Sequence, residues 1–289
     1  MVDRIEYIIF SGFSLLFKIC GLKLSRRFST LLAFIFYYII PIRKDITIEN
    51  LTRAFPEFDS RKIKKIAFGS YKSFAITLIE ILYLPWMNKD EAYKAVMCPN
   101  INLIKSKYAE QNGLILLSAH FGNWEYMAVS IALQTGVPFS VVVKAQRNTL
   151  VTDWLNTVRC NWGNKIVPLG ISIRQIYKEL KDKNIVAMVA DQRGPSDGAK
   201  VNFFGRKAAV YSGPTVLALK TGAPILYGIA IRQPDNTYFS EFHEICIDNL
   251  PEDYEERVSE INQRLTDYLE NIIRKYPEQW LWMHKRWKY

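Results

Sequence analysis

The sequence is poor in the residues that build metal and disulfide sites. It contains only four cysteines and three histidines in 289 residues. No two cysteines form a CxxC pair, and the histidines have no spacing typical of zinc ligands. The scattered cysteines (Cys20, Cys98, Cys160 and Cys246) favour a reducing compartment. We therefore expect no metal, no other cofactor and no disulfide framework.

Several familiar motifs are also missing. There is no GxxxxGK[ST] loop and no GxGxxG run, so a nucleotide site is not expected. Without a GxSxG elbow, a serine hydrolase would lack its nucleophile. The chain has 38 basic against 28 acidic residues, a net charge of +10, which suits nucleic acid, anionic lipid or an acidic protein partner. Because zinc-finger spacing, RNA-recognition signatures and a long basic tail are absent, nucleic acid is disfavoured.

No uninterrupted apolar run reaches the ~20 residues that a membrane-spanning helix needs. Two shorter runs occupy residues 7–17 and 28–42, with four basic residues between them. No small-residue cleavage site follows the first run, so a removed signal peptide is not expected. The runs fit two buried helices, one short span, or helices lying in the membrane interface. If the first run spans, the basic residues would keep that side in the cytoplasm.

Apolar periodicity predicts the elements of the rest of the chain. Residues 43–111 have helical spacing with a break at Pro56, and Asp59 or Ser60 is the expected N-cap of the next helix. Strands are expected at 114–117, 139–143, 166–169, 185–190, 225–231 and 239–247. Helices are expected at 125–134, 150–160, 171–181, 212–221 and 254–275. This alternation predicts an α/β fold with a central, mostly parallel or mixed sheet flanked by helices, after a helical N-terminal segment.

The stretch from Gly113 to Tyr126, GLILLSAHFGNWEY, combines a buried strand, a tight turn and a helix start. Ligands of open α/β sheets bind in the crevice beyond the carboxyl ends of the strands. A neutral imidazole is a common general base, and a carboxylate on its other ring nitrogen fixes the tautomer. We therefore predict that His120 is the general base and that Glu125 orients it. The alternative is a surface turn with a capping glutamate and an incidental histidine.

Further charged and aromatic residues follow the other predicted strands. Candidates for stabilising an oxyanion or binding substrate are Lys144, Arg147, Arg159, Asp191, Arg193 and Arg206. Phe203 and Phe204 stand beside Arg206, as would suit an acyl chain next to a phosphate or carboxylate. The alternatives are ordinary surface charges, a turn-forming aspartate and a core phenylalanine pair.

The run HFGNWE, His120 to Glu125, resembles the signature of the bacterial lipid A biosynthesis acyltransferases, in which four residues separate His from Asp or Glu. Three later blocks, DQRGP, FFG and PEQWLWMHKRWK, resemble that family's blocks in the same order. The resemblance implies an inner-membrane anchor over residues 1–42 and an acyltransferase domain over residues 43–289 on the cytoplasmic side. That family commonly has Arg where Lys144 stands, so the choice between Lys144 and Arg147 remains open.

The resemblance also implies the reaction. The donor would be an acyl thioester on acyl carrier protein, and the acceptor a hydroxyl of a lipid A precursor. Alternatives are a different glycolipid or aminolipid acceptor with the same mechanism, hydrolysis by a water that His120 activates, and a non-catalytic lipid-binding or carrier-binding protein. An intact His120 and Glu125 argue against the last of these.

Overall fold

Two parallel aliphatic strands, β2 (Leu114–Ser118) and β5 (Ile185–Val189), lie side by side at the centre of the sheet. The computed structural model describes residues 1–169 and 173–288. The sheet has six strands in the order β11-β8-β2-β5-β3-β4. Five of them, β8 (Ile225–Gly228), β2, β5, β3 (Phe139–Val143) and β4 (Lys165–Pro168), are parallel, and β11 (Phe242–Glu244) is antiparallel. The predicted α/β fold is confirmed.

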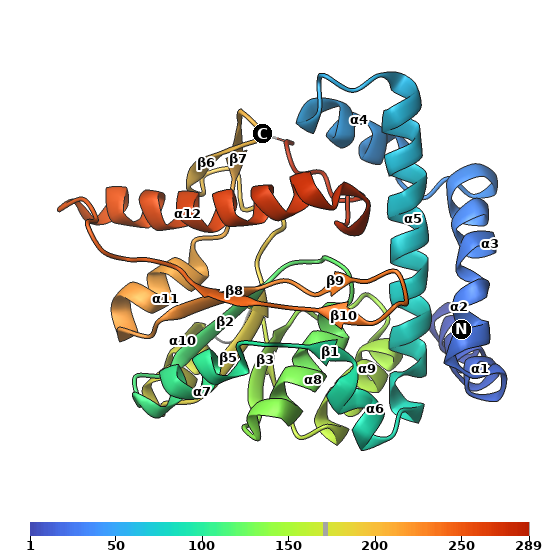
Figure 1. Cartoon of the computed structure of the whole chain (residues 1–289), viewed down its shortest axis with the longest axis horizontal. Coiled ribbons are helices and arrows are strands. Elements are labelled where there is room, and N and C mark those ends of the chain that lie inside the picture. The colour runs from blue at the N-terminus through green and yellow to red at the C-terminus, as the bar shows by residue number, and fades with distance from the viewer. Residues whose placement is uncertain (170–172, 289) are drawn as a thin grey trace.

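Helices cover both faces of this sheet, which explains why its central strands have almost no polar residues. Successive residues of β2 point to opposite faces, so Ile115 and Leu117 enter one apolar core and Leu114 and Leu116 enter the other. The first core contains residues of α10 (Ile173–Lys181), α11 (Gly213–Thr221) and α12 (Tyr254–Lys275). The second contains residues of α7 (Ile101–Ala109), α8 (Trp124–Thr135) and α9 (Thr149–Asn161). Figure 1 shows α12 and α8 on opposite sides of the sheet.

Most predicted elements are found, with differences where the chain leaves the main sheet. The expected strand 225–231 ends at Gly228, and the next residues form β9 (Ile231–Arg232) in a small sheet with β10 (Tyr238–Phe239) and β1 (Val96–Met97). The expected strand 239–247 shrinks to β11. Residues 171 and 172 of the expected helix 171–181 lie outside the described residues. The hairpin of β6 (Lys200–Phe203) and β7 (Arg206–Ala209) was not predicted.

The N-terminal third is helical and packs against one long helix, α5 (Ser60–Tyr83). It comprises α1 (Val2–Cys20), α2 (Leu22–Arg27), α3 (Ser29–Phe34), the π-helical turn η1 (Ile35–Ile39) and α4 (Lys44–Ala54). Asp59 caps α5, as predicted, because its side chain accepts the backbone N–H of Lys62 at 2.7 Å. In Figure 1, α5 stands between the sheet and α1, α2 and α3.

Apolar surface is concentrated in residues 1–42. Ile8 is 67% exposed and Ile19 is 75% exposed, and fifteen further large apolar residues from Met1 to Ile42 are exposed as well. Within the described chain, one helix, Ser60–Trp86, is long and apolar enough to cross a membrane, but half of its most apolar stretch is buried. The pair Val2–Cys20 and Leu22–Ile39 meets the same criterion only as one broken span bent by 115°.

Gly122 occupies a position that no other residue can fill without movement. Its φ is 53°, and a Cβ there would lie 1.9 Å from the carbonyl oxygen of Ala230. We expect Gly122→Ala to lower the free energy of unfolding by roughly 2–4 kcal/mol. Gly12→Ala is the control, because a Cβ at Gly12 meets nothing within 4 Å. Thermal unfolding of both variants in the same detergent checks the prediction, and equal melting temperatures would contradict it.

Candidate active site

The register of the two central strands brings His120 and Asp191 together. Ser118 of β2 pairs with Val189 of β5, and the two functional side chains come two residues after these paired positions. Parallel neighbours that leave the sheet at the same level stay close at its carboxyl edge. The Nδ1 of His120 lies 2.7 Å from Oδ1 of Asp191.

Asp191 is held as a buried carboxylate by three donors. Besides the imidazole, the backbone N–H of His120 donates to Oδ2 at 3.0 Å and the indole N–H of Trp280 donates to Oδ2 at 2.8 Å. Burial alone would raise the pKa of Asp191, but the charge of His120 and these hydrogen bonds outweigh it and lower the pKa. The carboxylate is therefore ionised at neutral pH and accepts the Nδ1–H of the imidazole.

The other imidazole nitrogen is left free to act on a ligand. Across residues 1–169 and 173–288, no group hydrogen-bonds to Nε2 of His120, and the side chain is 20% exposed. Burial lowers the pKa of His120, but the charge and hydrogen bond of Asp191, with the charge of Glu125, raise it above the ordinary value. His120 also lines a narrow cleft, together with Ser70, Ser73, Phe74, Thr77, Gly122, Trp124, Gln279, Trp280 and Leu281.

Glu125 is not the partner of the imidazole, so the predicted contact is wrong. Arg159 of α9 holds this carboxylate with two hydrogen bonds, Nη2 to Oε1 at 2.6 Å and Nε to Oε2 at 2.9 Å. Glu125 lies in the first turn of α8, beyond the turn that carries His120, whereas Nδ1 faces Asp191 on the neighbouring strand end. The charge of Glu125 still reaches His120, because it contributes to raising the imidazole pKa.

Glu80 of α5 holds the turn between β2 and α8 in place. We call this residue and its partners the Glu80 cluster: Arg26, Glu80, Asn123, Arg232 and Tyr238. Glu80 is fully buried and accepts hydrogen bonds from Arg26, the amide of Asn123 and the hydroxyl of Tyr238. Asn123 in turn caps α8, since its Oδ1 accepts the backbone N–H of Tyr126 at 2.9 Å. The sequence signal for Glu80 was an acidic residue inside the apolar run ITLIEIL, and this signal was missed.

The C-terminal segment crosses the same turn as a strap. Phe121 and Trp280 form an antiparallel bridge, and the N–H of Leu281 donates to the carbonyl of His120 at 3.0 Å. The N–H of Gly122 donates to the carbonyl of Gln279 at 3.0 Å. The resemblance included this block, but its role in bonding Asp191 through Trp280 was not predicted.

The other predicted cations are dispersed. Arg147 forms ion pairs with Asp3 and Glu6 of α1, and Arg206 donates to the carbonyl of Arg53 at 3.2 Å. Lys144 is exposed just beyond β3. Neither these three nor Arg159 is among the residues that line the cleft at His120. Arg193 lies nearer the site, on the loop after Asp191, with its Nη1 3.5 Å from the carbonyl of Lys285 in the C-terminal segment.

Phe203 and Phe204 are packed into the core. Their side chains are 0% and 6% exposed, and their rings contact an aromatic cluster made by Phe55, Trp280, Trp282 and Trp287. The predicted acyl-pocket role is therefore not supported by their position. Both residues are core phenylalanines, which was the alternative interpretation of the sequence.

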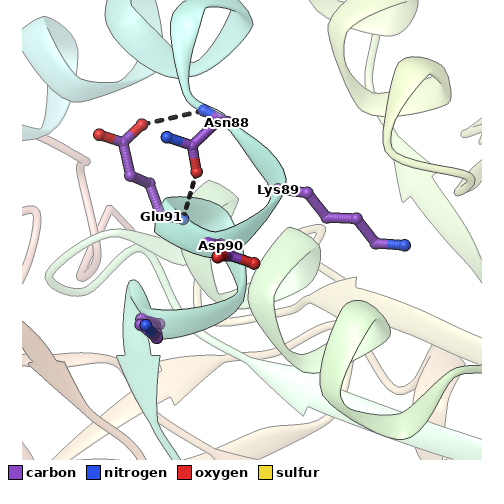
Figure 2. Close-up of a pocket in the computed structure, with 5 residues that line it drawn as sticks. Asn88, Lys89, Asp90 and Glu91 are labelled. Carbon is purple, nitrogen blue, oxygen red and sulfur yellow. Dashed lines mark hydrogen bonds between the residues drawn. The ribbon is translucent and has the colours of Figure 1, made fainter.

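A second surface depression lies at the start of α6 (Lys89–Lys94), away from these groups. Figure 2 shows that its polar groups bond one another in a capping box: Asn88 accepts the N–H of Glu91, and Glu91 accepts the N–H of Asn88, both at 2.9 Å. The depression is thus part of a helix cap. No group of His, Cys, Asp and Glu in the described chain could hold a metal ion.

An oriented imidazole at the carboxyl edge of an α/β sheet, beside a narrow cleft, is the arrangement of a general acid–base catalyst. The model of the bacterial lipid A biosynthesis acyltransferase family matches residues 4–289. The chain therefore belongs to this family, and it is an acyltransferase that acts on a lipid acceptor.

Three curated relatives span most of this chain. The lipid A biosynthesis lauroyltransferase of Escherichia coli K12 is 26% identical over 255 residues, 85% of this chain and 79% of the relative. The lipid A biosynthesis palmitoleoyltransferase of the same organism is 23% identical over 248 residues, with the same coverage. A phosphatidylinositol mannoside acyltransferase of Mycolicibacterium smegmatis is 24% identical over 223 residues, 76% of this chain and 71% of the relative.

The pKa values of two histidines are shifted in opposite directions. The pKa of His120 is raised from 6.5, whereas burial and the neighbouring arginines lower the pKa of His284 to about 4, against the attraction of Asp191. Histidine NMR titrations should therefore find His120 charged and His284 neutral at pH values between about 4 and 6.5. Asp191→Asn should drop the pKa of His120 below 6.5, because burial then acts against a weaker partner. An unchanged His120 titration in that variant would contradict the pairing.

Proposed function

We propose that this enzyme transfers a fatty acyl chain from an acyl carrier protein thioester to a hydroxyl of a lipid A precursor. The observation that carries the proposal is the free Nε2 of His120, backed by the hydrogen bond from Nδ1 to Asp191. Such a nitrogen is a general base, and an acceptor that brings its own hydroxyl needs no protein nucleophile.

In the proposed mechanism, Nε2 removes the proton from the acceptor hydroxyl as its oxygen attacks the thioester carbonyl. A C–O bond forms, and the tetrahedral intermediate then breaks its C–S bond. The imidazolium returns the proton to the departing thiolate, so the products are an ester and a thiol. Asp191 stabilises the imidazolium, and Glu125 adds a weaker attraction from its pair with Arg159.

The acceptor and donor are supported by the relatives and by charge. Two of the relatives are named for lipid A biosynthesis and the third for phosphatidylinositol mannoside, and both lipids are glycolipids, so another glycolipid acceptor is the second candidate. The net charge of +10 suits an acidic carrier and anionic lipid headgroups. Lipid mass spectrometry of a deletion strain separates the candidates, because the lipid that lacks an acyl chain identifies the acceptor.

We also propose that residues 1–42 attach the enzyme to the cytoplasmic face of the inner membrane, with residues 43–289 as the acyltransferase domain. The exposed apolar side chains of α1, α2 and α3 support this attachment.

His120→Ala should lower acyl transfer by about 10²–10⁴-fold while the protein still folds. His243→Ala is the matched control, since His243 is exposed on β11. The assay uses purified protein, a carrier-bound donor and a lipid A precursor. Activity of His120→Ala within a few-fold of wild type would exclude His120 as the base.

The pH dependence of the rate distinguishes the role of Asp191 from that of Glu125. The base must be neutral, so the rate should rise as pH increases through the raised pKa of His120. Asp191→Asn should reduce the maximal rate by about 10²-fold or more and move this acidic limb to lower pH. Glu125→Gln should move the limb in the same direction by a smaller amount. A larger shift from Glu125→Gln would reverse the two roles.

Charged substitutions on the exposed face of α1 should release the enzyme from membranes. Replacing Ile8 and Ile19 by Glu places two charges at positions that are 67% and 75% exposed, so folding should be little affected. Replacing the exposed Met97, at 62%, by Glu is the control on another element. Equal recovery of all proteins in carbonate-washed membranes would show that the attachment lies elsewhere.

A further inference from the structure

The Glu80 cluster contains an acid that needs a cation. Glu80 is 0% exposed, and a buried carboxylate costs several kcal/mol unless charged and polar partners surround it. Its two oxygens have different partners. Oε1 is bound by Nε and Nη2 of Arg26 at 2.8 and 2.7 Å, and Oε2 is bound by Asn123 and Tyr238.

Arg26 is the cation closest to this carboxylate. Arg232 also approaches Oε2, but at 3.7 Å, and its nitrogens donate to the hydroxyls of Ser73, Thr77 and Tyr238. Arg26 is only 19% exposed in its side chain and directs two nitrogens at a single oxygen. Removing it would therefore leave Oε1 buried without a charged partner at hydrogen-bond distance within the described chain.

The carboxylate in turn orients the turn that carries His120. Its Oε2 accepts the side-chain amide of Asn123 at 2.8 Å, which aims the Oδ1 of Asn123 at the N–H of Tyr126. Thr77, one helical turn before Glu80, donates to the carbonyl of Gly122. Helix α5 thus holds two consecutive residues of the turn, and His120 lies two residues before the first of them.

Arg26 belongs to α2, inside the N-terminal segment proposed as the membrane attachment. We propose that Arg26 is a positioning residue for acyl transfer: it stabilises ionised Glu80, which orients Asn123 and the turn that carries His120. The N-terminal segment therefore completes the catalytic domain as well as meeting lipid. This inference rests on the proposed acyl transfer for its kinetic test.

The kinetic test compares Arg26→Ala with Arg27→Ala in full-length enzyme in detergent micelles. Arg27 is the next residue of α2, is exposed, and makes no ion pair in the described chain. Arg26→Ala should lower kcat by about 10–100-fold with little change in KM, because a small displacement of a catalytic group costs rate. Arg27→Ala should retain wild-type kcat, and both should be recovered equally in membranes. Equal kcat values for the two variants would overturn the proposal.

Three further variants, Arg26→Lys, Glu80→Gln and the double variant of Arg26→Ala with Glu80→Gln, distinguish positioning from loss of the fold. Arg26→Lys should recover part of the lost kcat, because it restores a cation at the same place. Glu80→Gln added to Arg26→Ala should also raise kcat above that of Arg26→Ala alone, because the unpaired buried charge is removed. If the loss of kcat in the double variant equals the product of the losses in Arg26→Ala and in Glu80→Gln alone, the two residues act independently and the proposal fails.

A measurement without substrate keeps this inference separate from the proposed function. Hydrogen exchange of peptides covering residues 119–130 should be faster in Arg26→Ala than in wild type, while peptides from β5 are unchanged. Unchanged exchange at 119–130 would overturn the positioning role. If wild-type enzyme transfers no acyl group from any carrier-bound donor, the proposed function fails, and the exchange data still decide whether Arg26 orders the turn.

Discussion

The ionised carboxylate of Asp191 is the group on which the site depends. A carboxylate buried at a strand end costs several kcal/mol unless donors replace the lost water. Its donors come from two separate parts of the chain: the imidazole and backbone of His120, and the indole of Trp280. The turn after β2 and the C-terminal strap must therefore both reach the end of β5. The bridge between Phe121 and Trp280 follows from the same requirement, because it carries the indole to the carboxylate.

The main sheet could be predicted because its strands are short aliphatic runs bounded by turns. The periodicity located β2, β3 and β5 to within a residue, and it gave α12 its observed bounds. The small sheet could not be predicted, since its two-residue strands exist only through distant pairing, such as Val96 with Tyr238. The β6–β7 hairpin turns at Phe204 and Gly205, both with positive φ. A phenylalanine in that conformation gives no turn signal, because β-turns of this kind favour Asn and Asp.

The site was only partly predictable, for a reason of sequence distance. His120 follows a buried strand and was identified, but the nearest carboxylate in the chain, Glu125, was taken as its partner. The true partner is 71 positions away and is reached only through the register of β2 and β5. One signal was available: Asp191 ends the aliphatic run NIVAMVAD in the same way that His120 ends LILLSAH. Parallel neighbouring strands place such ends together, but the order of the strands is not written in either run.

Three buried or nearly buried carboxylates surround the turn, and each is paired with a different element. Asp191 binds His120, Glu125 joins α8 to Arg159 of α9, and Glu80 joins the turn to Arg26 of α2. Removing one partner of a buried ion pair lowers the stability of a protein by more than the intact pair raises it. Such pairs therefore favour one arrangement of the chain more than they add to its stability. Asp191 holds the imidazole by Nδ1 and accepts the backbone N–H of His120, while Glu80 holds Asn123 farther along the same turn. Because only Nε2 is left without a partner within the described chain, the same contacts that order the turn also determine which atom can receive a proton.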